Sequence, residues 1–246
     1  MLRRGTVRGA QSLLAVSLTM VAGTVAAGTA TAGTTDASGD RVRAAYAVTS
    51  SLRGLWHLDE TTGAVAVDSS GLKHNGKIFA ATLGVDGFLG TSFQFNSDKA
   101  RVEVPSAADL NPGTSNFEVT AHIYLDAAPA KGETYDVFRK GLSSTSGGEF
   151  KLEIVPGGRA QCTAKDSKKL VGKVVAKTTS LADQAWHMVG CRRVGNTWSV
   201  VVDGKVVSKT VSFGSISNTK KISIGGKYGQ EDGVRGRVDE VQFWIG

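Results

Sequence analysis

The sequence predicts an all-β fold in which two antiparallel sheets pack face to face as a sandwich. Three observations indicate this fold. Apolar and polar residues alternate with a period of two in many short segments, no long stretch has the three-and-four spacing of a helix, and clusters of Gly, Asn and Asp separate the segments. From Ser51 to Gly246 the chain has roughly 200 residues, enough for a full hydrophobic core. We therefore expect one all-β domain over residues 51–246.

The alternating segments predict about a dozen short strands. The clearest are SFQFN (92–96), RVEVP (101–105), FEVTAHIYL (117–125), FKLEIV (150–155), KISIGG (221–226) and RVDEVQFWI (237–245). The segment TWSVVVDGKVVSKTV (197–211) predicts a hairpin, because two valine-rich strands flank Asp203-Gly204. That pair suits the positive φ values of a two-residue type I′ turn.

The first 32 residues have the three parts of an export signal. Arg3, Arg4 and Arg8 give a positive start, residues 12–25 are mostly apolar, and Ala30-Thr31-Ala32 forms a small-residue cleavage site. No later segment approaches the roughly 18 consecutive apolar residues that a membrane span needs. We therefore predict a signal peptide over residues 1–32 and a secreted, extracellular protein with no membrane span.

Residues 33–50 are rich in Thr, Ala, Ser and Gly and show no apolar periodicity, so we predict a disordered linker there. The formal net charge of +7 falls by three when the signal peptide is removed. The remaining lysines are scattered, and no arginine block with interleaved aromatic residues appears. This pattern argues against nucleic acid as a partner and leaves open a weak preference for acidic polymers.

The chain has two cysteines, Cys162 and Cys191. An even count in an exported, oxidising context predicts a disulfide bond between them. Two cysteines are too few for a zinc site built from paired CxxC motifs.

Six segments, in this order, resemble one family. They are GLWHLDETTGAVAVDSSGLKHNGKI (54–78), FQFN (93–96), VEVP (102–105), NFEVTAHIYL (116–125), AWHMVGCRRVGNTWSVVVDGKVV (185–207) and GRVDEVQFW (236–244). Together they are similar to a laminin-G-like (LamG) domain of the concanavalin A-like class. The resemblance implies a jelly roll of two curved antiparallel sheets. It implies a monomeric, non-catalytic module that binds a glycan or polysaccharide, or acts in adhesion, and a disulfide between neighbouring strands. A cell-surface protein is the alternative partner.

The resemblance also implies a structural calcium site. The positions that match the metal side of the family are Asp68 and Asn75, in the loop DSSGLKHNG, and Asp239 near the C-terminus. Calcium takes six to eight oxygen ligands, which carboxylates, amides and main-chain carbonyls supply. Taken alone, the loop has the composition of an ordinary tight turn. His74 is expected to be a loop residue, because imidazole is a poor ligand for a hard cation.

The family comparison places three tryptophans, Trp56, Trp186 and Trp244, in strands, and we expect them to be buried. Trp198, which follows a glycine turn, is the candidate for an exposed ring that could stack on a sugar. His57 and His187 follow tryptophans within strands and are expected to be surface or partly buried residues rather than catalytic bases.

A polysaccharide-active enzyme, a glycoside hydrolase or lyase, is the alternative function on this fold. The Glu-x-Asp-x-x-Glu pattern of the hydrolases of this class is absent, as are G-x-S-x-G and HExxH. Consecutive pairs such as Asp239-Glu240 point to opposite faces of a strand unless a bulge intervenes. The sequence therefore favours a binding module.

Two loop-like segments each combine a tyrosine with charged residues. These are GETYDVFRKG (132–141) and GGKYGQEDG (225–233). We predict a ligand site formed by Tyr135, Arg139, Lys140 and Tyr228, where a ring covers the apolar face of a sugar and the cations bind its polar groups. The alternative is that both tyrosines cap the edges of the sheets.

Overall fold

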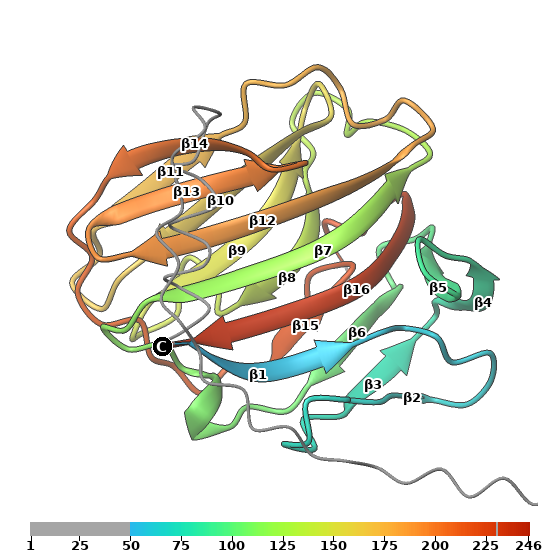
Figure 1. Ribbon diagram of the computed structural model, residues 1–246, viewed down its shortest axis with the longest axis horizontal. Helices are drawn as coiled ribbons and strands as arrows, with labels where there is room; N and C mark the ends of the chain where they lie inside the picture. The colour runs from blue at the N-terminus through green and yellow to red at the C-terminus, as the bar shows by residue number, and fades with distance from the viewer. Residues whose placement is uncertain (1–49, 230) are drawn as a thin grey trace, which may run out of the picture. The chain divides into compact units, whose positions relative to one another are not determined.

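The computed structural model describes residues 50–229 and 231–246. The predicted signal peptide lies outside these residues, as does the predicted linker apart from Ser50. The described part of the chain consists of two antiparallel sheets and one 3-10 turn, η1 (Ala108–Leu110) (Figure 1). None of its helical segments is long and apolar enough to cross a bilayer. The predicted antiparallel sandwich is confirmed.

Each sheet has eight strands. Sheet A has the order β14-β13-β12-β7-β16-β5-β4, and β1 also pairs with β16. Its strands are β1 (Ser51–Trp56), β4 (Thr82–Asp86), β5 (Thr91–Phe95), β7 (Phe117–Leu125), β12 (Trp186–Val194), β13 (Thr197–Val202), β14 (Lys205–Thr210) and β16 (Gly236–Ile245). Sheet B has the order β11-β10-β9-β8-β15-β6-β3-β2. Its strands are β2 (Val65–Ala66), β3 (Gly76–Phe79), β6 (Arg101–Val104), β8 (Tyr135–Lys140), β9 (Glu149–Val155), β10 (Arg159–Lys165), β11 (Val171–Val175) and β15 (Ile222–Ile224).

The strands alternate between a core face and an outer face. In β7, the side chains of Phe117, Val119, Ala121, Ile123 and Leu125 are fully buried between the sheets. The residues between them point outward, because successive side chains of a strand lie on opposite faces. β7 is a central strand of sheet A, so its outward residues lie in the middle of an outer face.

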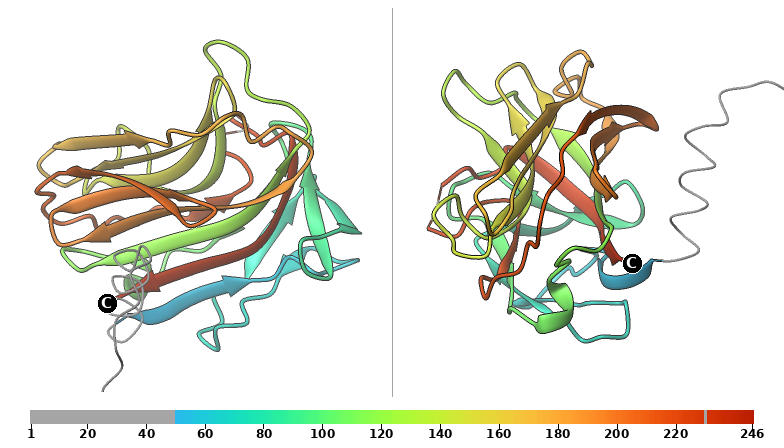
Figure 2. Two further views of the ribbon diagram at one scale, coloured as in Figure 1. Left: turned by 45° about the horizontal axis from the view of Figure 1, so that its top comes forward. Right: turned by 90° about the vertical axis from the view of Figure 1, so that its left-hand side faces the viewer.

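Figure 2 shows the two curved sheets as facing layers. Aromatic rings from both sheets meet in the core between them. The ring of Phe117 lies 4.7 Å from that of Phe150 on sheet B and 5.6 Å from that of Trp198 on sheet A, measured between centroids. Phe150 and Phe243 stack with centroids 5.5 Å apart. These contacts join the two sheets through large apolar side chains, which contribute most of the burial free energy of such a core.

The structure corrects the predictions for three of the four tryptophans. Trp198 is fully buried rather than exposed, and its indole N–H donates to the carbonyl oxygen of Cys162 at 3.1 Å. Trp56 is buried as predicted. Trp186 and Trp244 are only partly buried, because they occupy outward positions of β12 and β16. Trp186 is therefore free to contribute to a surface site.

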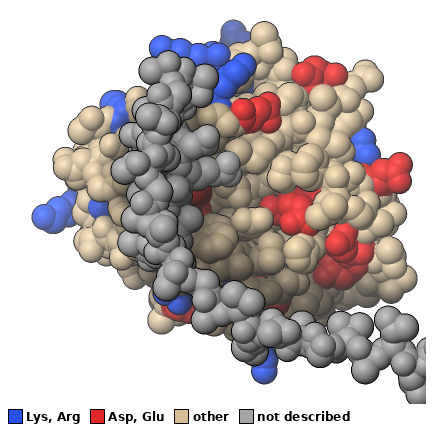
Figure 3. Space-filling model, in the orientation of Figure 1, with Lys and Arg blue, Asp and Glu red and all other residues tan. Residues whose placement is uncertain are grey.

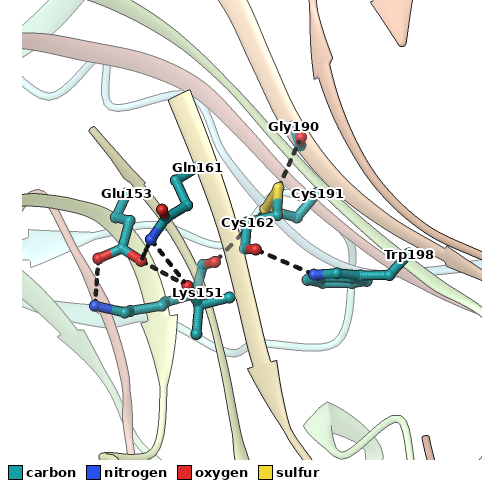
Figure 4. The surroundings of a disulfide bond; sticks show 8 residues. Lys151, Glu153, Gln161, Cys162, Gly190, Cys191 and Trp198 are labelled. Carbon is teal, nitrogen blue, oxygen red and sulfur yellow. Dashed lines mark hydrogen bonds and ion pairs between the residues drawn. A yellow bond between two sulfur atoms is a disulfide. The ribbon is translucent and has the colours of Figure 1, made fainter. Parts of the chain in front are cut away.

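A disulfide bond joins Cys162 and Cys191, as predicted. Cys162 lies on β10 of sheet B and Cys191 on β12 of sheet A, so the bond connects the two sheets rather than neighbouring strands of one sheet. Figure 4 shows the buried Trp198 ring beside this bond. The covalent link therefore passes through the core of the sandwich.

The loop after β2 is organised by the carboxylate of Asp68. One oxygen, Oδ1, accepts the N–H groups of Leu55 (3.0 Å) and Ser70 (2.9 Å). The other, Oδ2, accepts the N–H of His74 and the hydroxyl of Ser70, both at 2.8 Å. The N–H of Asp68 in turn donates to Asn75 Oδ1 at 2.8 Å. Burial of Asp68 opposes ionisation, but these hydrogen bonds outweigh it and lower the pKa.

The predicted hairpin at Asp203-Gly204 is confirmed. It joins β13 to β14, and both residues have positive φ, 47° and 79°. The Asp203 carboxylate also accepts the N–H of Met188 at 2.9 Å and contacts His187 Nδ1 at 2.7 Å. The turn is thus tied to the first residues of β12.

Replacing both cysteines by alanine should lower the free energy of unfolding by about 2–4 kcal/mol, because the cross-link restricts the unfolded chain. Urea unfolding of the purified, oxidised protein measures this difference. Wild-type protein unfolded in reductant should match the double variant. Equal stability of oxidised wild type and double variant would contradict a structural role for the bond.

Replacing Asp68 by asparagine should destabilise the protein by about 1–3 kcal/mol at neutral pH, since the three partly buried N–H groups of Leu55, Ser70 and His74 lose a charged acceptor. The folded-state pKa is lowered below 3.8, so the ionised carboxylate stabilises the fold above that pH and the contribution is lost as the pH falls through the folded-state pKa. Wild type and variant should therefore converge in strongly acidic solution. Unfolding curves of both proteins at several pH values test this prediction, and Glu133→Gln, at an exposed position, is the control. A difference in unfolding free energy between wild type and Asp68→Asn that stays constant at all pH values would contradict it.

Candidate functional site

Two of the four predicted ligand-binding residues lie inside the protein. The segment predicted as a loop contains strand β8, and its first residue, Tyr135, is only 5% exposed and packs in the core. Lys140, at the other end of β8, is fully buried, and its ammonium donates to the carbonyl oxygen of Lys220 at 2.7 Å and to Ser106 Oγ at 3.2 Å. Burial lowers the pKa of Lys140 to about 8. Tyr135 therefore offers no exposed ring, and Lys140 no free ammonium.

The other two are close enough to interact electrostatically: Arg139 is in β8, and Tyr228 is in the segment that follows β15. The Arg139 guanidinium, 3% exposed, binds the carboxylate of Asp136 and donates to Glu149 Oε2 at 3.1 Å. Burial raises the pKa of Asp136 to about 6, although the charges of Arg139 and Lys151 oppose this shift. Burial also raises the pKa of Tyr228 to about 12. These residues form an internal polar network, and Arg139 already has its partners within the protein.

The predicted calcium ligands are likewise occupied by hydrogen-bond donors. Each carboxylate oxygen can accept about two hydrogen bonds, and both oxygens of Asp68 accept two. Asn75 uses its side-chain oxygen for the N–H of Asp68, and Asp239 contacts a different segment, residues 88–89. Oxygens that face N–H groups do not fit a cation unless the loops rearrange. The calcium prediction thus has no support from this arrangement.

The carboxylate of Asp239 holds the loop between β4 and β5. It is fully buried, and its Oδ2 accepts the N–H groups of Phe88 at 2.8 Å and Leu89 at 3.0 Å. Its Oδ1 accepts the N–H of Glu240, which has a φ of 49° in a bulge of β16. Burial raises the pKa of Asp239 to about 6 against the effect of these three N–H donors. Phe88 and Leu89 are consequently held at the surface, 52% and 62% exposed.

Phe88 begins an aromatic cluster on the outer face of sheet A. Its ring stacks on the imidazole of His122 with centroids 3.8 Å apart and 9° between the planes. Trp186 lies edge-on to Phe88 at 6.3 Å and 5.8 Å from Tyr124. The guanidinium of Arg237 lies 3.9 Å from the centre of the Tyr124 ring. We call Phe88, His122, Tyr124, Trp186 and Arg237 the aromatic face.

Strand register brings these residues together. Tyr124 of β7 is opposite both Trp186 of β12 and Arg237 of β16, so the three form one row across sheet A. His122 occupies the next outward position of β7, opposite Asp239. Side chains directly opposite one another in antiparallel strands are about 5 Å apart at Cβ, which explains the ring contacts.

Titratable groups surround the aromatic face. His57 Nδ1 lies 2.7 Å from Glu240 Oε1, and these two side chains form a compact group with Asp59. His187 lies between Asp183 (2.9 Å) and Asp203 (2.7 Å). Figure 3 shows acidic side chains gathered on the right-hand half of this side of the molecule, where the β13–β14 turn and the first residues of β16 lie in Figure 1. The surface beside the rings is therefore rich in hydrogen-bond acceptors.

Burial lowers the pKa of His187, but the carboxylates of Asp183 and Asp203 stabilise the imidazolium more strongly, so the pKa is raised overall. The pKa of His122 is lowered, because burial outweighs the attraction of Glu240 and Asp203 for the imidazolium. A neutral His122 ring suits stacking against Phe88.

The aromatic face was missed at the sequence level although part of its signal is visible. The alternation in FEVTAHIYL already assigns His122 and Tyr124 to the outer side of β7. Phe88 and Leu89 lie between Gly87 and Gly90, an apolar pair in a turn. The contact of this turn with β7 depends on a hydrogen bond to Asp239, 151 residues from Phe88, which no local pattern indicates.

The chemistry of the face is that of binding. Exposed and half-buried rings can contact C–H groups, while Arg237, Glu240, His57 and His122 can hydrogen-bond hydroxyl groups. Asp239, a carboxyl group with a raised pKa next to this face, is fully buried and already accepts three N–H groups, so a substrate does not reach it.

Solved structures share this fold at low sequence identity. The binding domain of Paraclostridial Mosquitocidal Protein 1 is similar with a TM-score of 0.64 and 15% identity, over 79% of this chain and 48% of that chain. A botulinum neurotoxin type C structure, described as showing cell entry dependent upon two ganglioside molecules, has a TM-score of 0.60 and 13% identity, over 79% and 48%. The present chain thus spans about half the length of these two.

Domain 4 of AbnA, a GH43 extracellular arabinanase from Geobacillus stearothermophilus, was solved with arabinotriose. It has a TM-score of 0.57 and 14% identity, over 80% of this chain and 93% of that chain. A comparison with curated proteins gave no match. The family model Laminin_G_3 matches residues 96–245. The chain therefore belongs to this family of the concanavalin A-like lectin/glucanases superfamily.

Proposed function

We propose that this protein is a secreted, non-catalytic module that binds a glycan on the aromatic face. The observation that carries the proposal is the exposed Phe88 ring, held flat on His122 beside Trp186 and Tyr124. A sugar ring has a C–H face that packs on aromatic rings and hydroxyl groups that need polar partners at their edges. Both kinds of partner are present here. The predicted signal peptide supports secretion.

Preorganisation favours this surface as a binding site. The Phe88 loop is fixed by Asp239, and Arg237 is fixed by its contact with Tyr124 and by donation to the carbonyl oxygen of Asp86 at 3.0 Å. Side chains that are ordered before binding lose less conformational entropy when a ligand arrives. The arabinotriose complex of AbnA domain 4 and the ganglioside interaction named for the neurotoxin support a glycan as the ligand class.

A protein ligand is the second candidate. The binding domain of botulinum neurotoxin DC, which shares the fold at 13% identity, was solved with rat synaptotagmin II. Apolar Phe88 and Leu89 would also suit a protein surface. A glycan panel that gives no retention, together with capture of a purified surface protein that depends on Phe88, would favour this candidate.

The enzyme alternative is tested with the same panel. A hydrolase releases reducing ends and a lyase releases unsaturated products, whereas a binding module retains the polymer without change. Formation of either product by the wild-type protein would overturn the non-catalytic proposal.

Calcium binding by Asp68, Asn75 and Asp239 remains a prediction of the family resemblance. Because the Asp68 oxygens are occupied, we expect melting temperatures in calcium and in chelator to agree. Calcium at about 100 times its Kd would raise the unfolding free energy by about 2.7 kcal/mol. A rise of that size, removed by Asp239→Asn, would restore the calcium site.

Replacing Trp186 or Phe88 by alanine should weaken glycan retention by roughly tenfold or more, or about 1.4 kcal/mol, since each ring supplies stacking area. Affinity electrophoresis or calorimetry with the glycan that the panel identifies measures the loss. Val206→Ala is the matched control, because Val206 is an exposed apolar residue of sheet A outside the aromatic face. Normal unfolding curves with unchanged glycan affinity in both variants would show that the site lies elsewhere.

A further inference from the structure

A polar pocket lies between the β8–β9 loop and the β10–β11 loop. Its volume is about 430 Å³, and it is lined by residues 143–147 and by Lys165, Asp166, Ser167 and Lys169. None of these residues belongs to the aromatic face. The first loop contributes four consecutive hydroxyl side chains in the sequence SSTS.

The pocket presents unused hydrogen-bond donors. Within residues 50–229 and 231–246, the hydroxyl groups of Ser144, Ser146 and Ser167 have no hydrogen-bond partner, and the Lys169 ammonium has no ion pair. The Lys165 ammonium contacts the carbonyl oxygen of Ser143 and keeps further donor capacity, because an ammonium has three N–H groups.

The one carboxylate of the pocket is occupied by its own loop. Asp166 Oδ1 accepts the N–H groups of Lys168 and Leu170, each at 2.9 Å, and Oδ2 accepts the N–H of Gly214 at 2.8 Å. Its acceptor sites face backbone donors, while the two lysines supply positive charge. The pocket is therefore complementary to an anion with several oxygen acceptors.

The loops are fixed by close backbone contacts. Gly147 has a φ of 85°, and a Cβ atom there would lie 1.9 Å from the carbonyl oxygen of Ser217. The N–H of Ser217 donates to the carbonyl oxygen of Gly147 at 2.9 Å, and Thr145 Oγ1 accepts the N–H of Leu142 at 2.8 Å. The hydroxyl groups are thus carried by an ordered loop, which lowers the entropic cost of binding.

Two exposed apolar residues follow the last lining residue of the pocket in the chain. Leu170 and Val171, directly after Lys169, are 43% and 49% exposed. An inorganic anion gains nothing from contact with apolar side chains, whereas the C–H face of a sugar is stabilised by such contact.

We propose that this pocket binds the anionic group of an acidic sugar, a sulfate ester or a uronic carboxylate. Lys169, Lys165 and the serine hydroxyls bind the anion, and Leu170 contacts the sugar ring. The proposal rests on glycan binding as the function but does not depend on the aromatic face, since the two sites share no residue.

The test is a titration of the secreted protein followed by amide chemical shifts. The probes are galactose 6-sulfate, methyl glucuronide, uncharged methyl galactoside and inorganic sulfate. The acidic sugars should shift the amides of residues 143–147 and 165–169, whereas methyl galactoside should not. Comparison of the two acidic sugars identifies the preferred anionic group.

Lys169→Gln should weaken binding of the preferred sugar about tenfold, the effect of removing one charge-assisted hydrogen bond. Ser144→Ala, which keeps both lysines, should weaken it less, and Lys173→Gln on neighbouring β11 is the charge-matched control. Four outcomes would each overturn the proposal. Methyl galactoside could bind as tightly as the acidic sugars, or Lys173→Gln could lose as much affinity as Lys169→Gln. Amide shifts could also appear with inorganic sulfate alone, or with none of the probes.

The variant Trp186→Ala distinguishes binding in the pocket from binding on the aromatic face. This variant should bind the acidic monosaccharides like wild type. Loss of acidic-sugar binding in Trp186→Ala, with Lys169→Gln unaffected, would assign the ligand to the aromatic face and remove the pocket as a site.

Discussion

The hydrogen bonds of the buried Asp239 carboxylate are the constraint on which the candidate site depends. They connect the bulge of β16 to the loop after β4 and place Phe88 over His122. The bulge itself leaves Glu240 with a φ of 49°, a conformation that is costly for a residue other than glycine. The bulge and the Asp239 hydrogen bonds occur together in β16 for a geometric reason. In a regular strand, the Asp239 carboxylate could not face the loop after β4 while Glu240 faces His57.

Much of the fold was predictable because alternation is a local property. The bounds expected for the strand at residues 117–125 agree with those of β7, and the Asp203-Gly204 turn was recognisable from two residues. The exposure of an outward-facing side chain, however, depends on the tertiary structure and not on the local pattern. The side chains of Arg139 and Lys140 leave β8 on opposite sides, and neither is free: one enters an ion network and the other the interior.

Trp198 and Trp186 show the same limit. Trp186 is the first residue of β12 and Trp198 the second residue of β13, but register places Trp198 beside Phe117 in the core and Trp186 beside Tyr124 at the surface. The burial of each tryptophan is therefore set by its neighbours across the sheet and not by the residues next to it in the sequence. The Phe88 loop is a stronger example, because its position depends on a carboxylate far away in the sequence.

The length of β12 has a consequence for long ligands. Trp186 begins this strand, and Arg193 near its end donates to the carbonyl oxygens of Gly113 and Gly214, next to the segment that carries the serine-lined pocket. Nine residues of strand span about 26 Å, the length of several sugar units. A monosaccharide can therefore occupy only one end, whereas a polymer that reaches both ends would gain from high effective concentration at the second contact. Chain length, as well as sugar identity, would then set how strongly the domain is retained on a polysaccharide.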